Sequence, residues 1–454
     1  MFRVFANGLI IFSVLFCAGR LSANPVKEKL RAYIQTHDDA TLSMALRDSV
    51  GYTITLEEVK KLADEEKCQP LKRAVKAASA INGLEISQDL SLAELVQITY
   101  FIEVRLKAFI QEKKYYLPIK DSVLSRALEY DPITESVFIH LDIKNSACLG
   151  NGAKKRVTKS ILYDLDHPEI LARLDQTAHC RREMEMSKKL KGVNGVLQVK
   201  AYTERQEDGV NFRTMFCKLY RQGTIFQVLK NPEYKFTLKE KMHIALSIIK
   251  GLEGMQKRNI VHKDLHQHNY LVNISKRKNS SKRDIEVVIA DLGLAEYIWK
   301  SRHKRPQGDT NFTPPEGIVK KLSGKAFYST DLYAVGCLLY QICYEKMPYW
   351  QEVNYPKMAN SPKERAKRLY QLIEKSTASR RFELNAKSRS AKLTPKEEFE
   401  ATILQMVNPN PKKRLKVKQA RKQLEEALKR VSKRRAHFQV SFLDFPYESF
   451  QLCT

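Results

Sequence analysis

The stretch IVHKDLHQHNYLV, residues 260–272, decides the fold of this chain. Apolar residues flank a polar centre on both sides, which is the pattern of two short strands that enclose a loop. The polar centre holds a carboxylate at Asp264 and an amide at Asn269. Downstream, VVIADLGLAEY (287–297) places Asp291 directly after an apolar run, which predicts a buried strand that ends at this carboxylate.

Three further motifs follow in order along the chain. They are GDTNFTPPEG (308–317), the apolar helical pattern STDLYAVGCLLYQICYEKMPYW (329–350) and NPNPKKRL (408–415). Together with the two stretches above, they resemble the motifs of eukaryotic-type protein kinases, which include H-R-D-L-x-x-x-N, D-F-G and A-P-E. The resemblance covers roughly residues 132–435. It implies a protein kinase that uses ATP and Mg²⁺ and acts on a protein substrate.

The resemblance assigns catalytic roles to four residues. Asp264 would orient the substrate hydroxyl and accept its proton, while Asn269 and Asp291 would hold Mg²⁺ at the phosphates of ATP. REMEMSKKLKG (182–192) resembles the small-lobe helix that carries a phosphate-orienting glutamate. Glu183 is therefore a catalytic candidate, together with Asp264 and a phosphate-binding lysine.

Other positions of the resemblance are structural. Asp331 would anchor the backbone of the catalytic loop, and Arg414 would neutralise Glu316, since an unpaired buried charge is costly. Two residues depart from the family pattern. Lys263 replaces the arginine of H-R-D, which would alter a clamp on an activation-loop phosphate, and Leu292 replaces the phenylalanine of D-F-G while keeping an apolar side chain there.

The phosphate-binding cation has two candidates. LGNGAKKRV (149–157) begins with Gly-x-Gly and has Lys155 at the third-glycine position, which resembles the with-no-lysine kinases. The strand before Glu183 should carry a lysine, yet EILARLD (169–175) has Arg173 near that slot, ten residues before Glu183. Arginine is a poor substitute in a tight phosphate site. Alternatively, Arg173 does this work and Lys155 is a solvated loop residue. The nucleotide-binding candidates are Leu149, Gly150, Gly152, Lys155, Val157, Arg173 and Cys217.

Substrate preference rests on two positions. His266 stands where Ser/Thr kinases usually have lysine, and Asp309 stands where many of them carry threonine, with Thr310 adjacent. The sequence favours Ser/Thr over Tyr as acceptors. Ser301 and Thr310 lie among basic residues between Asp291 and Glu316, so phosphorylation there could order the activation segment.

The expected fold class is α+β, a bilobal protein-kinase-like fold at residues 131–438. Short β-like runs and one helical segment predict a small antiparallel lobe at about 131–219, and helical patterns predict a large lobe at about 220–438. Helical spacing also predicts an all-α N-terminal domain at 24–130, and residues 439–454 form a tail.

The N-terminus predicts export. Arg3 precedes an apolar stretch at 9–18 that is short for a membrane span, so residues 1–23 are expected to be a signal peptide. Bulky Phe16 disfavours a lipoprotein processed at Cys17, and an uncleaved membrane anchor at 8–19 is the alternative. The 8 cysteines are scattered without C-x-x-C, which does not indicate a disulfide framework. A secreted effector of an intracellular bacterium, active inside a host cell, reconciles both observations.

The charge of this 454-residue chain is +28, which favours anionic partners such as acidic host proteins or anionic membrane surfaces. No aromatic-interleaved basic motif is present, so no specific nucleic acid is expected. Basic segments at 275–283 and 360–368 are expected to be exposed loops, and 411–435 a packed helix with a basic outer face.

Two other functions stay open. One is a pseudokinase scaffold, which the uncertain lysine favours and the acidic motif residues disfavour. The other is a small-molecule phosphotransferase, because DLHQHN (264–269) resembles the D-L-H-x-x-N of aminoglycoside- and choline-kinase-like enzymes. Fold by itself does not decide the substrate.

Overall fold

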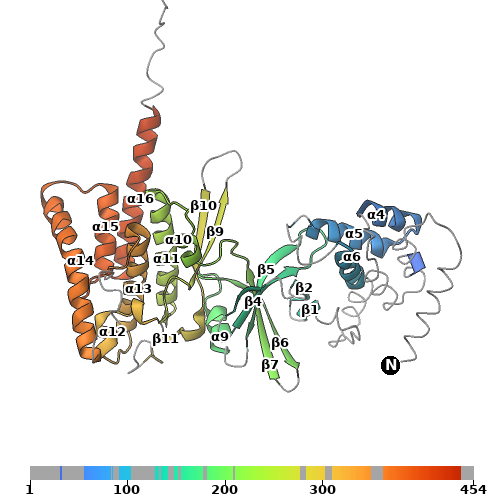
Figure 1. Ribbon diagram of the computed structural model, residues 1–454, viewed down its shortest axis with the longest axis horizontal. Helices are drawn as coiled ribbons and strands as arrows, with labels where there is room; N and C mark the ends of the chain where they lie inside the picture. Colours follow the sequence, from blue (N-terminus) through green and yellow to red (C-terminus); the bar gives the residue numbers. More distant parts are fainter. Residues whose placement is uncertain are drawn as a thin grey trace, which may run out of the picture. The chain divides into compact units, whose positions relative to one another are not determined.

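The described residues of the computed structural model form two compact units (Figure 1). One unit contains the chain up to residue 178 together with 200–219, and the other contains 179–199 together with the chain from 220 onward. Residues 1–23, expected to be a signal peptide, lie outside the described residues, as do Gly152 and residues 441–454. The structure describes residues 31–32, 56–82, 84, 92–103, 128–131, 134–141, 148–151, 155–176, 181–207, 210–276, 283–301, 309–348 and 361–440.

Helices of the first unit pack on one face of its sheet. They are α4 (Leu56–Glu65), α5 (Gln69–Asn82) and α6 (Leu92–Phe101), and their apolar faces form a buried core. Val137, Ile139 and Ile161 from the sheet belong to the same core, so helices and strands bury one another. α4–α6 lie within the region expected to be helical, but they share one unit and one core with the strands instead of forming a separate all-α domain. The boundary expected between 130 and 131 falls inside a strand of the sheet.

The sheet of the first unit has seven strands in the order β1-β2-β4-β5-β7-β6, with β3 paired to β4. Every described register in it is antiparallel, as the short alternating runs predict. On its other face, the rings of Phe138 and Phe216 stack with centroids 3.7 Å apart. The strands are β1 (Leu128–Asp131), β2 (Ser136–His140), β3 (Cys148–Asn151), β4 (Lys155–Leu162), β5 (Glu169–Gln176), β6 (Val199–Glu207) and β7 (Val210–Lys218).

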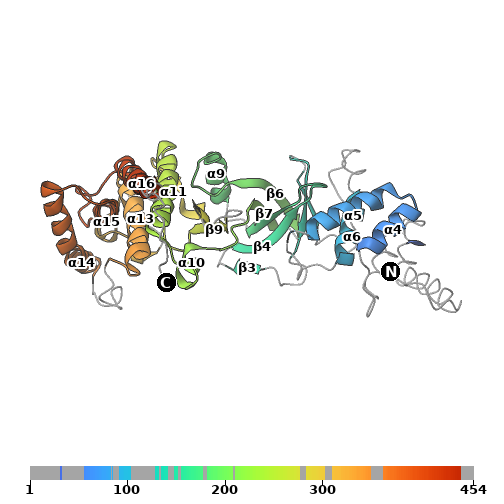
Figure 2. The same cartoon turned by 90° about the horizontal axis from the view of Figure 1, so that it is seen from above.

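The second unit is mainly helical and contains the catalytic-loop motif (Figures 1 and 2). Helix α13 is buried along most of its length and α11 along one face, and α15 and α16 pack around them. Thr237 begins α11 with a capping box to Glu240, which satisfies free N–H groups of the first turn. The helices are α9 (Arg181–Lys189), α10 (Ile225–Lys230), α11 (Leu238–Lys257), α12 (Pro315–Val319), α13 (Ala326–Tyr344), α14 (Pro362–Ser390), α15 (Pro395–Met406) and α16 (Val417–Val440).

Short strands enclose the two acidic motifs, as the apolar flanks predict. β8 (Ile260–Val261) precedes the catalytic loop and pairs antiparallel with β11 (Glu296–Tyr297). β9 (Tyr270–Lys276) follows the loop and pairs antiparallel with β10 (Arg283–Ile289), which leads into Asp291. The 3₁₀ helices η4 (Leu292–Leu294) and η5 (Thr310–Phe312) complete this unit.

One expectation about the basic segments is wrong. In the segment expected to be an exposed loop, Ser361 is the N-cap of α14 and residues 362–368 form the start of this helix. The Ser361 side chain accepts a hydrogen bond from Glu364 N, and Pro362 occupies the first helical position, where its missing N–H costs nothing. The helix expected at 411–435 begins at Val417. Among the described residues, no helix is both long and apolar enough to cross a membrane.

Candidate active site

The catalytic loop is held from two sides by buried hydrogen bonds. Asp331 of α13 is 2% exposed and accepts from His262 N at 2.8 Å and from Lys263 N at 2.9 Å, so the predicted anchor is confirmed. His262 is fully buried, and its Nε2 lies 3.0 Å from Ala290 O, just before Asp291. Burial raises the pKa of Asp331, and the two backbone N–H groups oppose this by stabilising the carboxylate. The loop backbone is therefore fixed relative to the second acidic motif.

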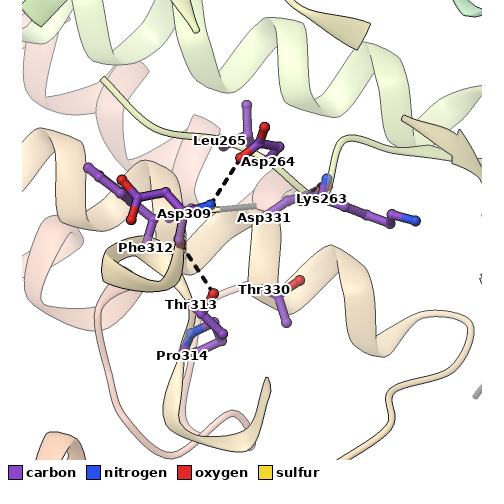
Figure 3. A pocket seen from close by; sticks show the side chains of 10 residues that line it. Lys263, Asp264, Leu265, Asp309, Phe312, Thr313, Pro314, Thr330 and Asp331 are labelled. Atoms are coloured by element: carbon purple, nitrogen blue, oxygen red, sulfur yellow. Dashed lines mark hydrogen bonds between the residues drawn. The ribbon is translucent and has the colours of Figure 1, made fainter. Parts of the chain in front are cut away.

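Asp264 faces a small pocket between the catalytic loop and the segment before α12 (Figure 3). Its Oδ1 accepts a hydrogen bond from Asp309 N at 3.2 Å. Phe312, Thr313 and Pro314 line the other side of the pocket. The side chain of Asp264 is 19% exposed, so the carboxylate is accessible to an incoming hydroxyl.

Asn269 is tied to Asp264 through its side-chain amide. Its Nδ2 donates to Asp264 O at 2.8 Å and lies 3.0 Å from His266 Nε2. Its backbone O accepts from Ala290 N at 2.9 Å, so Asn269 is also joined to the residue before Asp291. The predicted pair Asp264 and Asn269 is thus brought together in one hydrogen-bonded loop.

Asp291 adopts a left-handed backbone conformation with φ +59° and ψ +75°. This conformation is uncommon for a residue other than glycine and clusters at functional sites. The carboxylate accepts from Gly293 N at 3.3 Å, and a Cβ at Gly293 would lie 3.2 Å from Asp291 Oδ1 and 4.0 Å from Glu183 Oε2. Glu183 is 4% exposed, so α9 brings this carboxylate beside the D-L-G turn, and Leu292 is buried as expected.

Lys263 forms a buried ion pair with Glu296. Its Nζ lies 2.7 Å from Glu296 Oε1, with the two side chains 1% and 5% exposed. Ser301 is fully buried and its hydroxyl donates to Glu296 Oε1. Phosphorylation of Ser301, which the sequence analysis predicts as an option, would require this buried hydroxyl to become exposed. The side chain of Thr310, the other expected site, lies outside the described side chains.

The ion pair predicted between Glu316 and Arg414 is confirmed. Arg414 Nη1 lies 2.7 Å from Glu316 Oε1 and Nη2 lies 3.3 Å from Oε2, a bidentate arrangement. Arg414 also donates to Asn408 O and Ser329 O, and its side chain has no exposed surface. This network joins α12 to the first turn of α13 and to the segment before α16.

The strand register of the first unit shows on which face of the sheet Arg173 lies. Arg173 pairs with Thr158, whereas Val157 pairs with Leu174, so Arg173 and Val157 lie on opposite faces of the sheet. Arg173 is 4% exposed, and its Nε lies 3.1 Å from Asp175 Oδ1.

The other nucleotide-site candidates of the first unit lie in the same strands. Cys217 pairs with Ala172 and shares the face of Val157, and Lys155 stands two residues before Val157 in β4. Gly150 pairs with Val157, and Leu149 is 42% exposed. The face of Val157 therefore carries Leu174 rather than Arg173.

The metal candidates are two oxygen donors. Asp291 offers a carboxylate and Asn269 an amide oxygen, and hard oxygen ligands are those that Mg²⁺ prefers. Within the described ranges, no cluster of three or more His, Cys, Asp or Glu side chains could hold a metal ion. Because Mg²⁺ is commonly bound by one or two carboxylates together with substrate phosphates, the donor set fits Mg²⁺ that arrives with a nucleotide.

Comparison with known proteins agrees with this geometry. The family model of the protein kinase domain matches residues 153–424, more than half of the chain. The chain is 28% identical over 175 residues to serine/threonine-protein kinase PLK4 of Drosophila sechellia, covering 38% of this chain and 20% of the relative. For the PLK4 of Drosophila grimshawi the values are 26% over 209 residues, 45% and 25%. The matched segments span about a quarter or less of each relative.

Proposed function

Because this chain belongs to the protein kinase family, we propose that it is an active enzyme that transfers the γ-phosphate of ATP to serine or threonine hydroxyls of proteins. The observation that carries the proposal is the fixed geometry of Asp264, whose loop is held by Asp331 and whose carboxylate faces a pocket. The two relatives described above carry serine/threonine-protein kinase names, which supports this acceptor class.

The catalytic work of the chain's own residues follows from this geometry. Asp264 accepts a hydrogen bond from the acceptor hydroxyl, orients its oxygen towards the γ-phosphorus and takes its proton. Asp291 and Asn269 would hold Mg²⁺, and the bound ion would neutralise charge on the phosphates. Glu183, buried beside Gly293, orients the cation that contacts the phosphates.

We propose that Lys155 supplies this cation. Arg173 lies on the face of the sheet opposite to Val157, where it contacts Asp175. This position supports the proposal, because it directs Arg173 away from the face of Val157. Leu174, which shares the face of Val157, has no charge to offer. Lys155 is the first residue of β4 and matches the third-glycine position of the glycine-rich motif, which supports a cation that is provided by this segment.

A mixed kinase assay separates the alternative functions. The full chain is incubated with labelled ATP and a mixture of proteins, with and without EDTA. If the chain is a protein kinase, serine and threonine residues of the protein mixture are labelled when EDTA is absent and are not labelled when it is present. If the chain is a pseudokinase scaffold, no protein is labelled under either condition. A small-molecule phosphotransferase consumes ATP with amino-alcohol acceptors and leaves proteins unlabelled. The intact Glu316–Arg414 pair favours the protein kinase reading over the phosphotransferase.

We further propose that residues 1–23 direct export and that the enzyme acts inside a host cell on acidic partners or at anionic membranes. Among the described residues, Cys68, Cys337 and Cys343 form no disulfide, which is compatible with work in a reducing compartment. Fractionation of infected cells with an antibody to the kinase domain tests this proposal. Protein confined to the producing cell with an intact N-terminus contradicts it.

A further inference from the structure

We propose that the ion pair between Lys263 and Glu296 replaces an activating phosphate, so that the enzyme is active without phosphorylation of its activation segment, residues 291–316. The inference rests on the proposed function and concerns the regulation of the same site. The sequence predicts that a phosphate on this segment could order it through basic residues. Buried contacts among the described residues provide this order from the chain's own groups.

Lys263 is the cation of the catalytic loop that directly precedes Asp264. Its backbone N–H donates to Asp331 Oδ1 at 2.9 Å, and its side chain extends away from the carboxylate of Asp264 (Figure 3). The ammonium is buried, with Nζ 2.7 Å from Glu296 Oε1 and 5.9 Å from the centre of the Phe327 ring. Lys263 therefore joins the fixed catalytic loop to the activation segment.

The activation segment is held at the same place by its backbone and by Ser301. Glu296 is the first residue of β11 and pairs with Val261 of β8, while Ile298 N donates to Asn259 O at 2.8 Å. The Ser301 hydroxyl donates to Glu296 Oε1, so this carboxylate receives both an ammonium and a hydroxyl. This part of the segment is thus ordered against the catalytic loop by protein groups.

A phosphate has no favourable place in this arrangement. A phosphorylated residue carries a charge of about −1.5 to −2 at pH 7, and it orders a segment by pairing with a cation. The charge of Lys263 is already offset by Glu296, and the two side chains are only 1% and 5% exposed. A phosphate that approached Lys263 would lose hydration and would be repelled by the carboxylate. The pair therefore orders the segment and disfavours a phosphate in the same role.

The activity of unphosphorylated protein tests the inference. The full chain is produced together with a protein phosphatase, which is then removed, and mass spectrometry verifies that residues 291–316 carry no phosphate. Initial rates on a mixture of protein substrates are compared before and after incubation with Mg²⁺ and ATP. We expect the two rates to agree within about twofold, because no ordering step awaits a phosphate. A larger increase that accompanies phosphorylation of the segment overturns the inference and leaves the proposed function intact.

Hydrogen exchange measures the order of the segment without reference to activity. In the unphosphorylated wild type, we expect the amides of residues 294–301 to be protected. They should exchange at least about tenfold faster in Glu296→Gln, which removes the counter-charge of Lys263. Glu253→Gln is the control, because it also removes the charge of a buried carboxylate, which lies 3.2 Å from Arg421 Nε. This control should leave the exchange of 294–301 unchanged.

Ser301→Ala is the second variant, should Glu296→Gln fail to fold. It removes one hydrogen bond to the carboxylate and should raise the same exchange by roughly three- to tenfold. Exchange equal to wild type in Glu296→Gln, or in Ser301→Ala if only that variant folds, overturns the inference. A wild type that transfers no phosphate before or after phosphorylation refutes the proposed function, and the exchange rates still decide whether the ion pair orders the segment.

Discussion

Replacing Lys263 by methionine tests whether a buried ion pair joins the activation segment to the catalytic loop. Lys263 Nζ lies 2.7 Å from Glu296 Oε1, and the side chains are 1% and 5% exposed. Removing one partner of a buried pair costs about 3–5 kcal/mol, because the other charge stays in a medium that solvates it poorly. We expect the free energy of unfolding to fall by about 3 kcal/mol or more in Lys263→Met.

Urea unfolding followed by tryptophan fluorescence measures this loss. The chain has 2 tryptophans, so the measurement uses a Trp350→Phe background in which Trp299 reports alone. Trp299 stacks on Tyr297 with ring centroids 4.5 Å apart, next to Glu296. The control is Lys257→Met, which removes an exposed lysine 3.6 Å from Glu253 and should cost less than about 1 kcal/mol.

A double-mutant cycle isolates the pair from the packing of the two side chains. If the charges are coupled, Lys263→Met with Glu296→Gln is more stable than Lys263→Met, because the second change removes the uncompensated carboxylate. The reasoning is refuted if Lys263→Met costs less than about 1 kcal/mol, since a surface pair would give that value. It is also refuted if the two single effects add.

Three other outcomes are expected. Lys155→Met should weaken ATP binding, measured by calorimetry, at least tenfold more than Arg173→Met; the reverse ranking returns the phosphate contact to Arg173. Gly293→Ala should lower turnover about tenfold, because its Cβ would lie 3.2 Å from Asp291 Oδ1 and displace that carboxylate; wild-type turnover would contradict this. Burial raises the pKa of the Cys337 thiol to about 12, so iodoacetamide at pH 8 should leave it unmodified in the folded protein; rapid labelling detected by mass spectrometry would argue otherwise.

Much of the second unit could be predicted from local sequence. The strands around Asp264 and Asp291 follow from apolar runs that end at charged residues. These features depend on a few adjacent residues, so one sequence reveals them. The Glu316–Arg414 pair joins distant residues and was expected from the resemblance to protein kinases. Ser361-Pro362-x-Glu364 is also a local N-cap pattern that predicts the start of α14. The many basic residues of that segment led instead to the prediction of a loop.

The position of Arg173 could not be predicted, because it depends on strand register. A shift of one residue moves a side chain to the opposite face of a sheet, and EILARLD gives no local signal that separates Arg173 from Leu174. The burial of Ser301 also escaped prediction, since it arises from a contact with Glu296 that follows the pairing of β11 with β8.

Phosphoryl transfer by Asp264→Asn tests the central claim most directly. This variant keeps the size of the side chain and its acceptor oxygen but removes the charge that takes the proton. We predict that Asp264→Asn binds nucleotide as wild type does, while turnover on serine and threonine substrates falls by about a hundredfold or more. Transfer by Asp264→Asn at a rate near wild type, with label on serine and threonine, would contradict the account.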